Sequence, residues 1–181
     1  MEIALAQRDM CNAYIGGAAG ILASSLVWAG AAFSARYLSA DQVIIGFFIG
    51  GMFIHPAAIV LCKLLGRSGQ HRADNPLRYL PLETTVWLIA ALPIAYAASR
   101  VNVIWFFPAM MATIGARYLI FRTLFGLRTY WLLGASLIVA AIVCVHWRVG
   151  FSHAVLLGAA IEMSFAFAMF ILLKDKVNAT Q

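Results

Sequence analysis

The chain has 181 residues, of which 64% are hydrophobic and 11% are charged, and its mean hydropathy is +0.89. Soluble domains usually carry about 25% charged residues, so this composition excludes an ordinary soluble protein. The formal net charge of +6 requires neither a nucleic acid nor an acidic substrate, because membrane topology explains it.

Six apolar blocks divide the chain, and each approaches the length that a helix needs to cross a membrane. They lie at 13–34, 43–65, 84–99, 102–121, 130–147 and 151–173. A transmembrane helix needs about 20 apolar residues, whereas the strands of a transmembrane barrel alternate apolar and polar positions. The blocks show no such alternation. We therefore predict an all-α polytopic membrane protein, a bundle of six transmembrane helices in one domain that covers residues 1–181.

The first two blocks carry glycines that are spaced for close helix packing. Gly16 and Gly20 form one GxxxG pair, and Gly46 and Gly50 form another. Small residues at this spacing let two helix backbones approach closely. Packing inside one chain explains both pairs, and a homodimer contact through the same faces is the alternative.

Prolines inside the second and third blocks predict bends. Pro56 follows His55 near the middle of the second block, and Pro93 lies inside the third. Proline removes a helical hydrogen bond and kinks the helix around it. The third and fourth blocks are separated by a tight turn at 99–102, which leaves the limits of the third block the least defined.

The connection 66–83, with the sequence GRSGQHRADNPLRYLPLE, is the longest polar segment. Its Gly, Ser, Asn and Pro residues are typical of a loop, and its cations suit the lipid headgroups of the cytoplasmic leaflet. A segment this short cannot form a catalytic domain. Any chemistry therefore has to lie in the helical bundle or at its mouths.

The cations predict the orientation of the bundle. With six spans, both termini and the second and fourth connections share one side of the membrane. That side holds ten of the 13 cations, namely Arg8, Lys63, Arg67, Arg72, Arg78, Arg117, Arg122, Arg128, Lys174 and Lys176. Because Lys and Arg are retained on the cytoplasmic side, we expect both termini in the cytoplasm.

The start of the chain bears on its location. Arg8 and Asp9 precede a full-length span, and five more spans follow. This arrangement differs from a cleavable signal peptide, whose apolar region is shorter. We expect a multi-pass protein of a bacterial inner membrane that contacts the lipid bilayer and no nucleic acid.

Glu162 is the candidate functional residue, because it falls at the centre of the sixth block. A charged residue at this depth costs about 2.5 to 3.5 kcal/mol on insertion scales, and a protonated carboxyl is far cheaper to bury. Its helical face also carries Val155, Gly158, Ala159 and Ala166. Small neighbours let another helix come close, so we expect Glu162 to point into the bundle.

Two further residues are candidates for solute binding or proton coupling together with Glu162. His55 lies at a similar depth in the second block, and the two side chains could form a proton relay. Arg117 lies about three quarters of the way along the fourth block and has a long side chain that could reach Glu162. The alternatives are structural: an interhelical hydrogen bond for Glu162, a packed histidine for His55 and a headgroup anchor for Arg117.

We expect no cofactor and no metal site. His146 and His153 flank the fifth connection, and no pair of histidines shows the matched depth that a haem site needs. The cysteines form no CxxC pair and lie in or at the ends of different blocks; they are Cys11, Cys62 and Cys144.

The segment 107–134, FPAMMATIGARYLIFRTLFGLRTYWLLG, resembles the central part of a family of small bacterial polytopic proteins that is classed only as a domain of unknown function. The resemblance covers about the last two thirds of the chain. It implies a bacterial membrane protein and no activity, so it supplies no site residues.

Two functions remain in competition at this stage. The first is a small transporter or permease in which Glu162 couples proton movement to a small solute or ion, through a cavity lined by the second, fourth and sixth spans. The second is a non-transporting accessory or assembly protein whose polar residues form interhelical hydrogen bonds. We do not expect an enzyme, because no cluster of His, Asp or Ser lies at a membrane mouth in a recognisable spacing.

Overall fold

The computed structural model describes the backbone of residues 1–178 and the side chains as far as Leu173. Six stretches are long and apolar enough to cross a membrane, and the residues described contain helices and no strands. The predicted all-α bundle is thereby confirmed. In chain order the elements are α1 (Ile3–Tyr14), η1 (Ile15–Gly17), α2 (Ala18–Ser34), α3 (Ala40–Leu64), α4 (Leu80–Val101), η2 (Val103–Trp105), α5 (Phe106–Phe125), α6 (Thr129–His146) and α7 (Phe151–Asn178).

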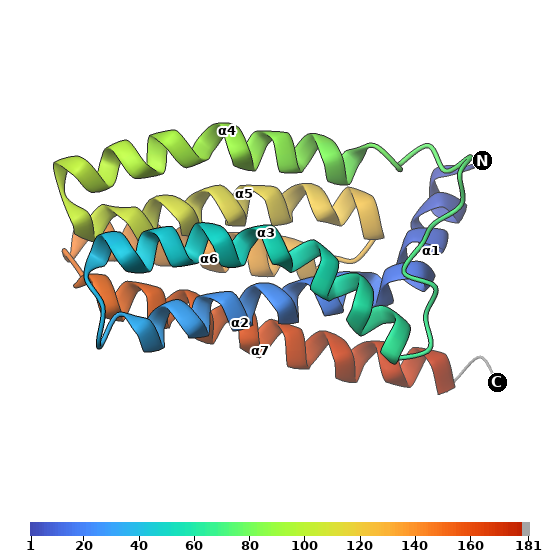
Figure 1. Ribbon diagram of the computed structural model, residues 1–181. Helices are drawn as coiled ribbons and strands as arrows, with labels where there is room; N and C mark the ends of the chain where they lie inside the picture. The colour runs from blue at the N-terminus through green and yellow to red at the C-terminus, as the bar shows by residue number, and fades with distance from the viewer. Residues whose placement is uncertain (179–181) are drawn as a thin grey trace.

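The helices α2 to α7 run along one common direction, and α1 lies across one end of them (Figure 1). We call this the loop end, because it also carries the connection 65–79 and the turn at 126–128. Within the bundle, α5 packs mainly on α6 and α2 on α7, while α3 joins α2 and α4 joins α5. The centre is therefore built from α2, α5, α6 and α7.

The cations that we assign to one side do lie at or toward the loop end by connectivity, apart from Arg117 inside α5. Lys174 and Lys176 are outside the described side chains. Arg36, Arg100 and Arg148 lie at the opposite end, where Arg100 pairs with Asp41 at 3.3 Å.

The first membrane stretch is broken, which the apolar block at 13–34 does not indicate. The helix α1 ends at Tyr14, and Ile15, Gly16 and Gly17 have φ angles of 54°, 55° and 83° before α2 begins. The left-handed region is costly for a β-branched residue such as Ile15. The predicted block at 13–34 therefore joins the end of α1, the break and α2 into one span.

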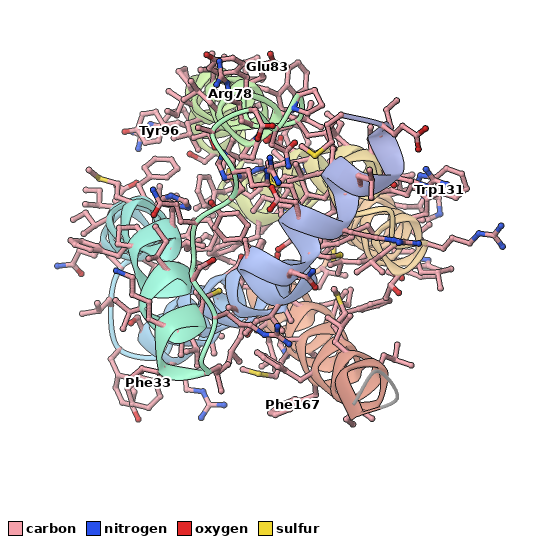
Figure 2. The ribbon with its side chains drawn as sticks, turned by 90° about the vertical axis from the view of Figure 1, so that its right-hand side faces the viewer. Phe33, Arg78, Glu83, Tyr96, Trp131 and Phe167 are labelled. Atoms are coloured by element: carbon pink, nitrogen blue, oxygen red, sulfur yellow. The ribbon has the colours of Figure 1, made fainter. Side chains whose placement is uncertain are left out.

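The connection 65–79 packs against α1, and Figure 2 shows both crossing the loop end in front of the bundle. Gly69 N donates to Ala13 O at 3.0 Å, and the Tyr14 hydroxyl lies 2.8 Å from His71 Nδ1. The headgroup loop that we expect is therefore fastened to the protein. At its exposed tip, the hydrogen bond from Arg72 holds the pKa of Asp74 below its ordinary value.

Both helices in which we predict a bend at proline continue past that proline. Pro56 and Pro93 lie inside α3 and α4, and α3 changes direction in its second half (Figure 1). The helix α4 begins at Leu80 rather than at 84, since Pro81 is well suited to the first helical turn.

Glycines lie at close helix contacts, but of the two predicted GxxxG pairs only Gly50 takes part in one. A Cβ added at Gly50 would lie 2.9 Å from the Val27 side chain of α2, whereas one added at Gly46 would meet nothing within 4 Å, so only Gly50 of the second pair serves packing inside the chain. The first pair forms no helix face, because Gly16 lies in the break and a Cβ at Gly20 would meet nothing within 4 Å. Instead, α5 and α6 meet through Gly115 and Gly134.

Candidate functional site

Glu162 lies at the middle of the membrane stretch of α7 and is fully buried, with 0% of its surface exposed. Val155, Ala159 and Ala166 on the same helical face are also buried. The predicted inward orientation of Glu162 is confirmed. Its Oε1 accepts a hydrogen bond of 3.2 Å from the hydroxyl of Tyr118, which comes from α5.

Two side chains of α2 complete the surroundings of the carboxyl group. Ser24 and Trp28 both adjoin it, and they lie four residues apart on one face of their helix. Trp28 can lie this deep because α7 has a glycine opposite it: a Cβ at Gly158 would be 2.6 Å from the indole ring. We call the four residues Glu162, Tyr118, Ser24 and Trp28 the Glu162 cage.

The Glu162 cage is buried, but two of its polar atoms lack a well-formed hydrogen bond. Oε2 of Glu162 and Nε1 of Trp28 are both buried and make no well-formed hydrogen bond to any described group. The ion pairs among the described side chains are Arg72 with Asp74 and Arg100 with Asp41, and both lie outside the cage. Glu162 therefore has a hydroxyl partner and no direct cationic partner there.

Arg117 lies next to Tyr118 in sequence but points toward α4. Its Nη2 donates to Thr85 Oγ1 at 3.1 Å, and its guanidinium carbon lies 5.1 Å from the centre of the Phe121 ring. It is close enough for its charge to act on Glu162 through space. The structure thus brings Arg117 near the carboxyl without a direct contact.

His55 is not brought to Glu162. The side chain is exposed on α3, whereas Gly50, five residues earlier, faces α2. At about 100° per residue, five residues turn the helix by about 140° from that face, which directs His55 outward. Similar depth in the membrane therefore does not make these two residues neighbours.

The residues that surround Glu162 come from the first, fourth and sixth spans, whereas we expected the second span in place of the first. Sequence reasoning missed Ser24, Trp28 and Tyr118. In α2, a polar residue four positions from a tryptophan within an apolar block could have indicated a buried polar face. The sequence does not indicate that this face meets α7.

Tyr130 links the cage to the break in the first membrane stretch. Its hydroxyl donates to Gly16 O at 2.7 Å, and its ring centre lies 6.0 Å from that of Tyr118. Tyr130 itself is fully buried. Aromatic side chains thus connect Glu162 with the non-helical segment toward the loop end.

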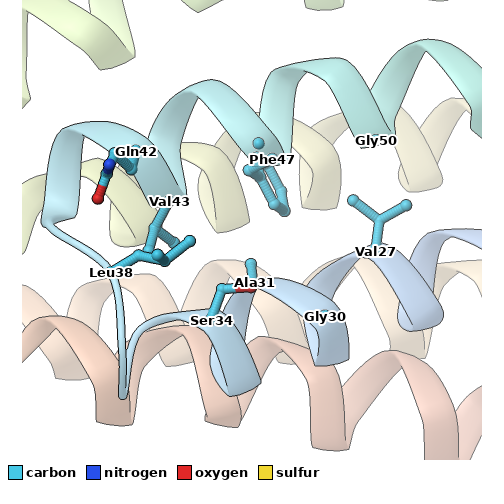
Figure 3. Close-up of a pocket in the computed structure, with 10 residues that line it drawn as sticks. Val27, Gly30, Ala31, Ser34, Leu38, Gln42, Val43, Phe47 and Gly50 are labelled. Carbon is cyan, nitrogen blue, oxygen red and sulfur yellow. The ribbon is translucent and has the colours of Figure 1, made fainter.

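Two grooves lie on the outside of α2. One of about 240 Å³ separates α2 from α3 and is lined by small and apolar residues such as Val27, Gly30 and Gly50 (Figure 3). The other, of about 220 Å³, is lined by residues of α2, α7 and the turn after α2. No cage residue lines either groove. Within the described side chains, no three His, Cys, Asp or Glu residues gather in a way that could hold a metal ion.

Comparison with known proteins adds a family and no activity. A model described as a family of unknown function, DUF7010, matches residues 3–174. This range contains all of the cage and nearly the whole bundle. No curated protein and no solved structure matches the chain.

Proposed function

The chain belongs to the DUF7010 family, and since this family has no described activity, we propose from the site that the protein is a small membrane transporter or permease. In this proposal, Glu162 takes up and releases a proton, and this cycle is coupled to the movement of a small solute or ion. We further propose that the loop end faces the cytoplasm of a bacterial inner membrane, since most cations lie there.

The observation that carries the proposal is the fully buried carboxyl of Glu162, whose Oε2 makes no well-formed hydrogen bond. Burying a polar group without a partner is unfavourable, and replacing it by an apolar residue would remove that cost. Ionisable residues at this depth mark proton relays and ion pathways in membrane proteins. A purely structural carboxyl would gain more from two satisfied oxygens.

The broken first membrane stretch supports the same function. Interrupted helices form substrate and ion sites in many transporters, and the interruption here lies at the loop end, beside the connection 65–79. Here the break at Ile15–Gly17 is covered by Tyr130, which in turn lies beside Tyr118 of the cage. The break and the carboxyl are therefore parts of one connected region.

The first experiment identifies a ligand and then measures flux. Thermal stability of the purified protein is recorded with a panel of ions and small metabolites at two pH values; a ligand at one hundred times its Kd should stabilise by about 2.7 kcal/mol. A ligand found in this way is tested in proteoliposomes that contain a pH-sensitive dye. We expect solute-driven proton movement by the wild type.

Glu162→Gln should abolish this proton movement and leave the protein folded, because the amide has a similar shape but carries no releasable proton. Glu83→Gln is the matched control, since Glu83 is an exposed acid on α4. His55→Ala should also leave the pH profile unchanged. Proton coupling that survives in Glu162→Gln would remove Glu162 from the mechanism.

A non-transporting accessory protein is the second candidate, and the closed state of the cage is the observation that favours it. Neither groove on α2 includes a cage residue. In that case no solute of the panel shifts the stability, and Glu162→Gln is as stable as the wild type or more so. This outcome would direct the search to a protein partner.

A further inference from the structure

Two unpaired atoms of the cage are chemically complementary. Among the described side chains, the buried polar atoms without a partner belong to Trp28, Glu162, Arg117 and Arg122. The atoms of the first two are the indole Nε1, which can only donate, and the carboxyl Oε2, which can accept. They belong to adjoining residues, so each is the obvious partner of the other.

We propose that Trp28 is a positioning residue for the ionised form of Glu162. When the carboxyl releases its proton, the indole N–H donates to Oε2 while Tyr118 keeps its hydrogen bond to Oε1. The inference rests on the proposed function, in which Glu162 carries the proton, and it names the group that makes release feasible inside the bundle.

Trp28 differs from the other cage residues because it can only donate, so it bonds the ionised carboxylate more strongly than the protonated carboxyl, which still accepts at its carbonyl oxygen. The hydroxyls of Ser24 and Tyr118 can donate to a carboxylate or accept from a protonated carboxyl, because a hydroxyl has both capacities. The indole nitrogen has no acceptor capacity. Its hydrogen bond is therefore strongest to the charged carboxylate, and a group with such differential interaction can shift an equilibrium between two states.

The surroundings of Trp28 hold the indole in place. Its ring centre lies 4.9 Å from that of Phe47 on α3 and 5.5 Å from that of Phe107 on α5. Gly158 on α7 closes the third side. A movement of the indole toward Oε2 would consequently change its contacts with α3, α5 and α7. Proton release would thereby be connected to helix packing.

The other charged and titratable groups around Glu162 do not replace this role. On α5, Arg117 acts through space and is engaged by Thr85, and Tyr118 is already bonded to Oε1. On α6, Tyr130 lies behind Tyr118 and donates to Gly16. At the cage, α2 contributes the uncharged Ser24 and Trp28, and His55 of α3 is exposed.

Infrared spectroscopy of the purified full-length protein tests the inference, because a protonated carboxylic acid has its own carbonyl band. The band of Glu162 is assigned by its loss in Glu162→Gln and is followed as the pH rises. Trp28→Phe keeps an aromatic ring and removes the N–H. We expect the midpoint at which the band disappears to move to higher pH by about one unit, a tenfold weaker tendency to release the proton.

The matched control is Trp87→Phe, because Trp87 is 53% exposed on α4 and its loss should leave the midpoint unchanged. The inference is overturned if Trp28→Phe and Trp87→Phe titrate alike. It is also overturned if the Glu162 band of the wild type persists at every pH at which the protein stays folded.

A second measurement needs no variant of Trp28 that folds. The chain has five tryptophans, and NMR of the protein in detergent is used to follow their indole N–H signals as the pH rises. One signal should shift with the Glu162 midpoint in the wild type and stay fixed in Glu162→Gln. If no signal does so, Trp28 does not donate a hydrogen bond to the carboxylate.

Flux measurements separate this inference from the proposed function. If Trp28→Phe shifts the titration but no solute is ever transported, the positioning role stands and the transport proposal fails. If transport depends on Glu162 but Trp28→Phe leaves the titration midpoint of Glu162 unchanged, the transport proposal stands and the positioning role fails.

Discussion

Asn75 fastens the connection between α3 and α4 to α1 with a side chain that is only 1% exposed. Its Nδ2 donates to Asp9 Oδ2 at 2.7 Å and to Ala6 O at 3.0 Å. Its Oδ1 accepts from Leu77 N at 2.9 Å. One amide thus uses both of its donors and its acceptor, which explains why a polar residue is buried in a loop.

Asn75→Ala should destabilise the protein by about 1 to 3 kcal/mol, because it removes the three hydrogen bonds that the buried amide makes to Ala6 O, Asp9 and Leu77 N. Thermal unfolding in detergent measures the effect. Gln70→Ala is the control, since Gln70 belongs to the same connection and is exposed. Equal stability of the two variants would mean that the connection is not held to α1 by Asn75.

At the scale of helices, α5 and α6 approach each other most closely where two glycines meet. A Cβ added at Gly134 would lie 2.6 Å from the carbonyl oxygen of Gly115, and one added at Gly115 would lie 2.8 Å from that of Gly134. The obstacle in both cases is backbone, which cannot turn aside as a side chain can. These two glycines, rather than the predicted GxxxG pairs, let two helix backbones come into direct contact.

Gly134→Ala should therefore force α5 and α6 apart and destabilise the protein by about 1 to 3 kcal/mol, as overpacked cores do. Gly20→Ala is the matched control. A Cβ there meets nothing within 4 Å, and alanine favours a helix by up to about 1 kcal/mol over glycine. We expect opposite shifts in melting temperature. A Gly134→Ala protein that melts no lower than Gly20→Ala would contradict the close crossing.

At the scale of the whole molecule, the number of spans could be predicted because the length of an apolar block is a local property. Successive spans cross in opposite directions, so the number of spans also determines which connections lie at the same end of the bundle. The neighbours of Glu162 could not be predicted in the same way, since Ser24 and Tyr118 are distant in sequence. His55 was misplaced for a related reason: a helix that is apolar all round does not indicate which side faces inward.

The direction of the bundle in the membrane is the remaining property of the whole molecule that the charge pattern predicts. Ser68 is exposed in the connection at the loop end, and Tyr37 is 72% exposed at the opposite end. Each is changed to cysteine in a protein without Cys11, Cys62 and Cys144. In intact cells, a thiol reagent that cannot cross the membrane should label Tyr37→Cys and not Ser68→Cys, because cations retain the loop end in the cytoplasm.

Labelling of Ser68→Cys alone would reverse the proposed orientation and leave the fold intact. Labelling of both positions would contradict the six-span topology, which places the two positions on opposite sides of the membrane. Permeabilised cells provide the control, since both cysteines should then react. If the loop end is cytoplasmic, the break at Ile15–Gly17, which Tyr130 joins to the Glu162 cage, also lies on the cytoplasmic side of the cage.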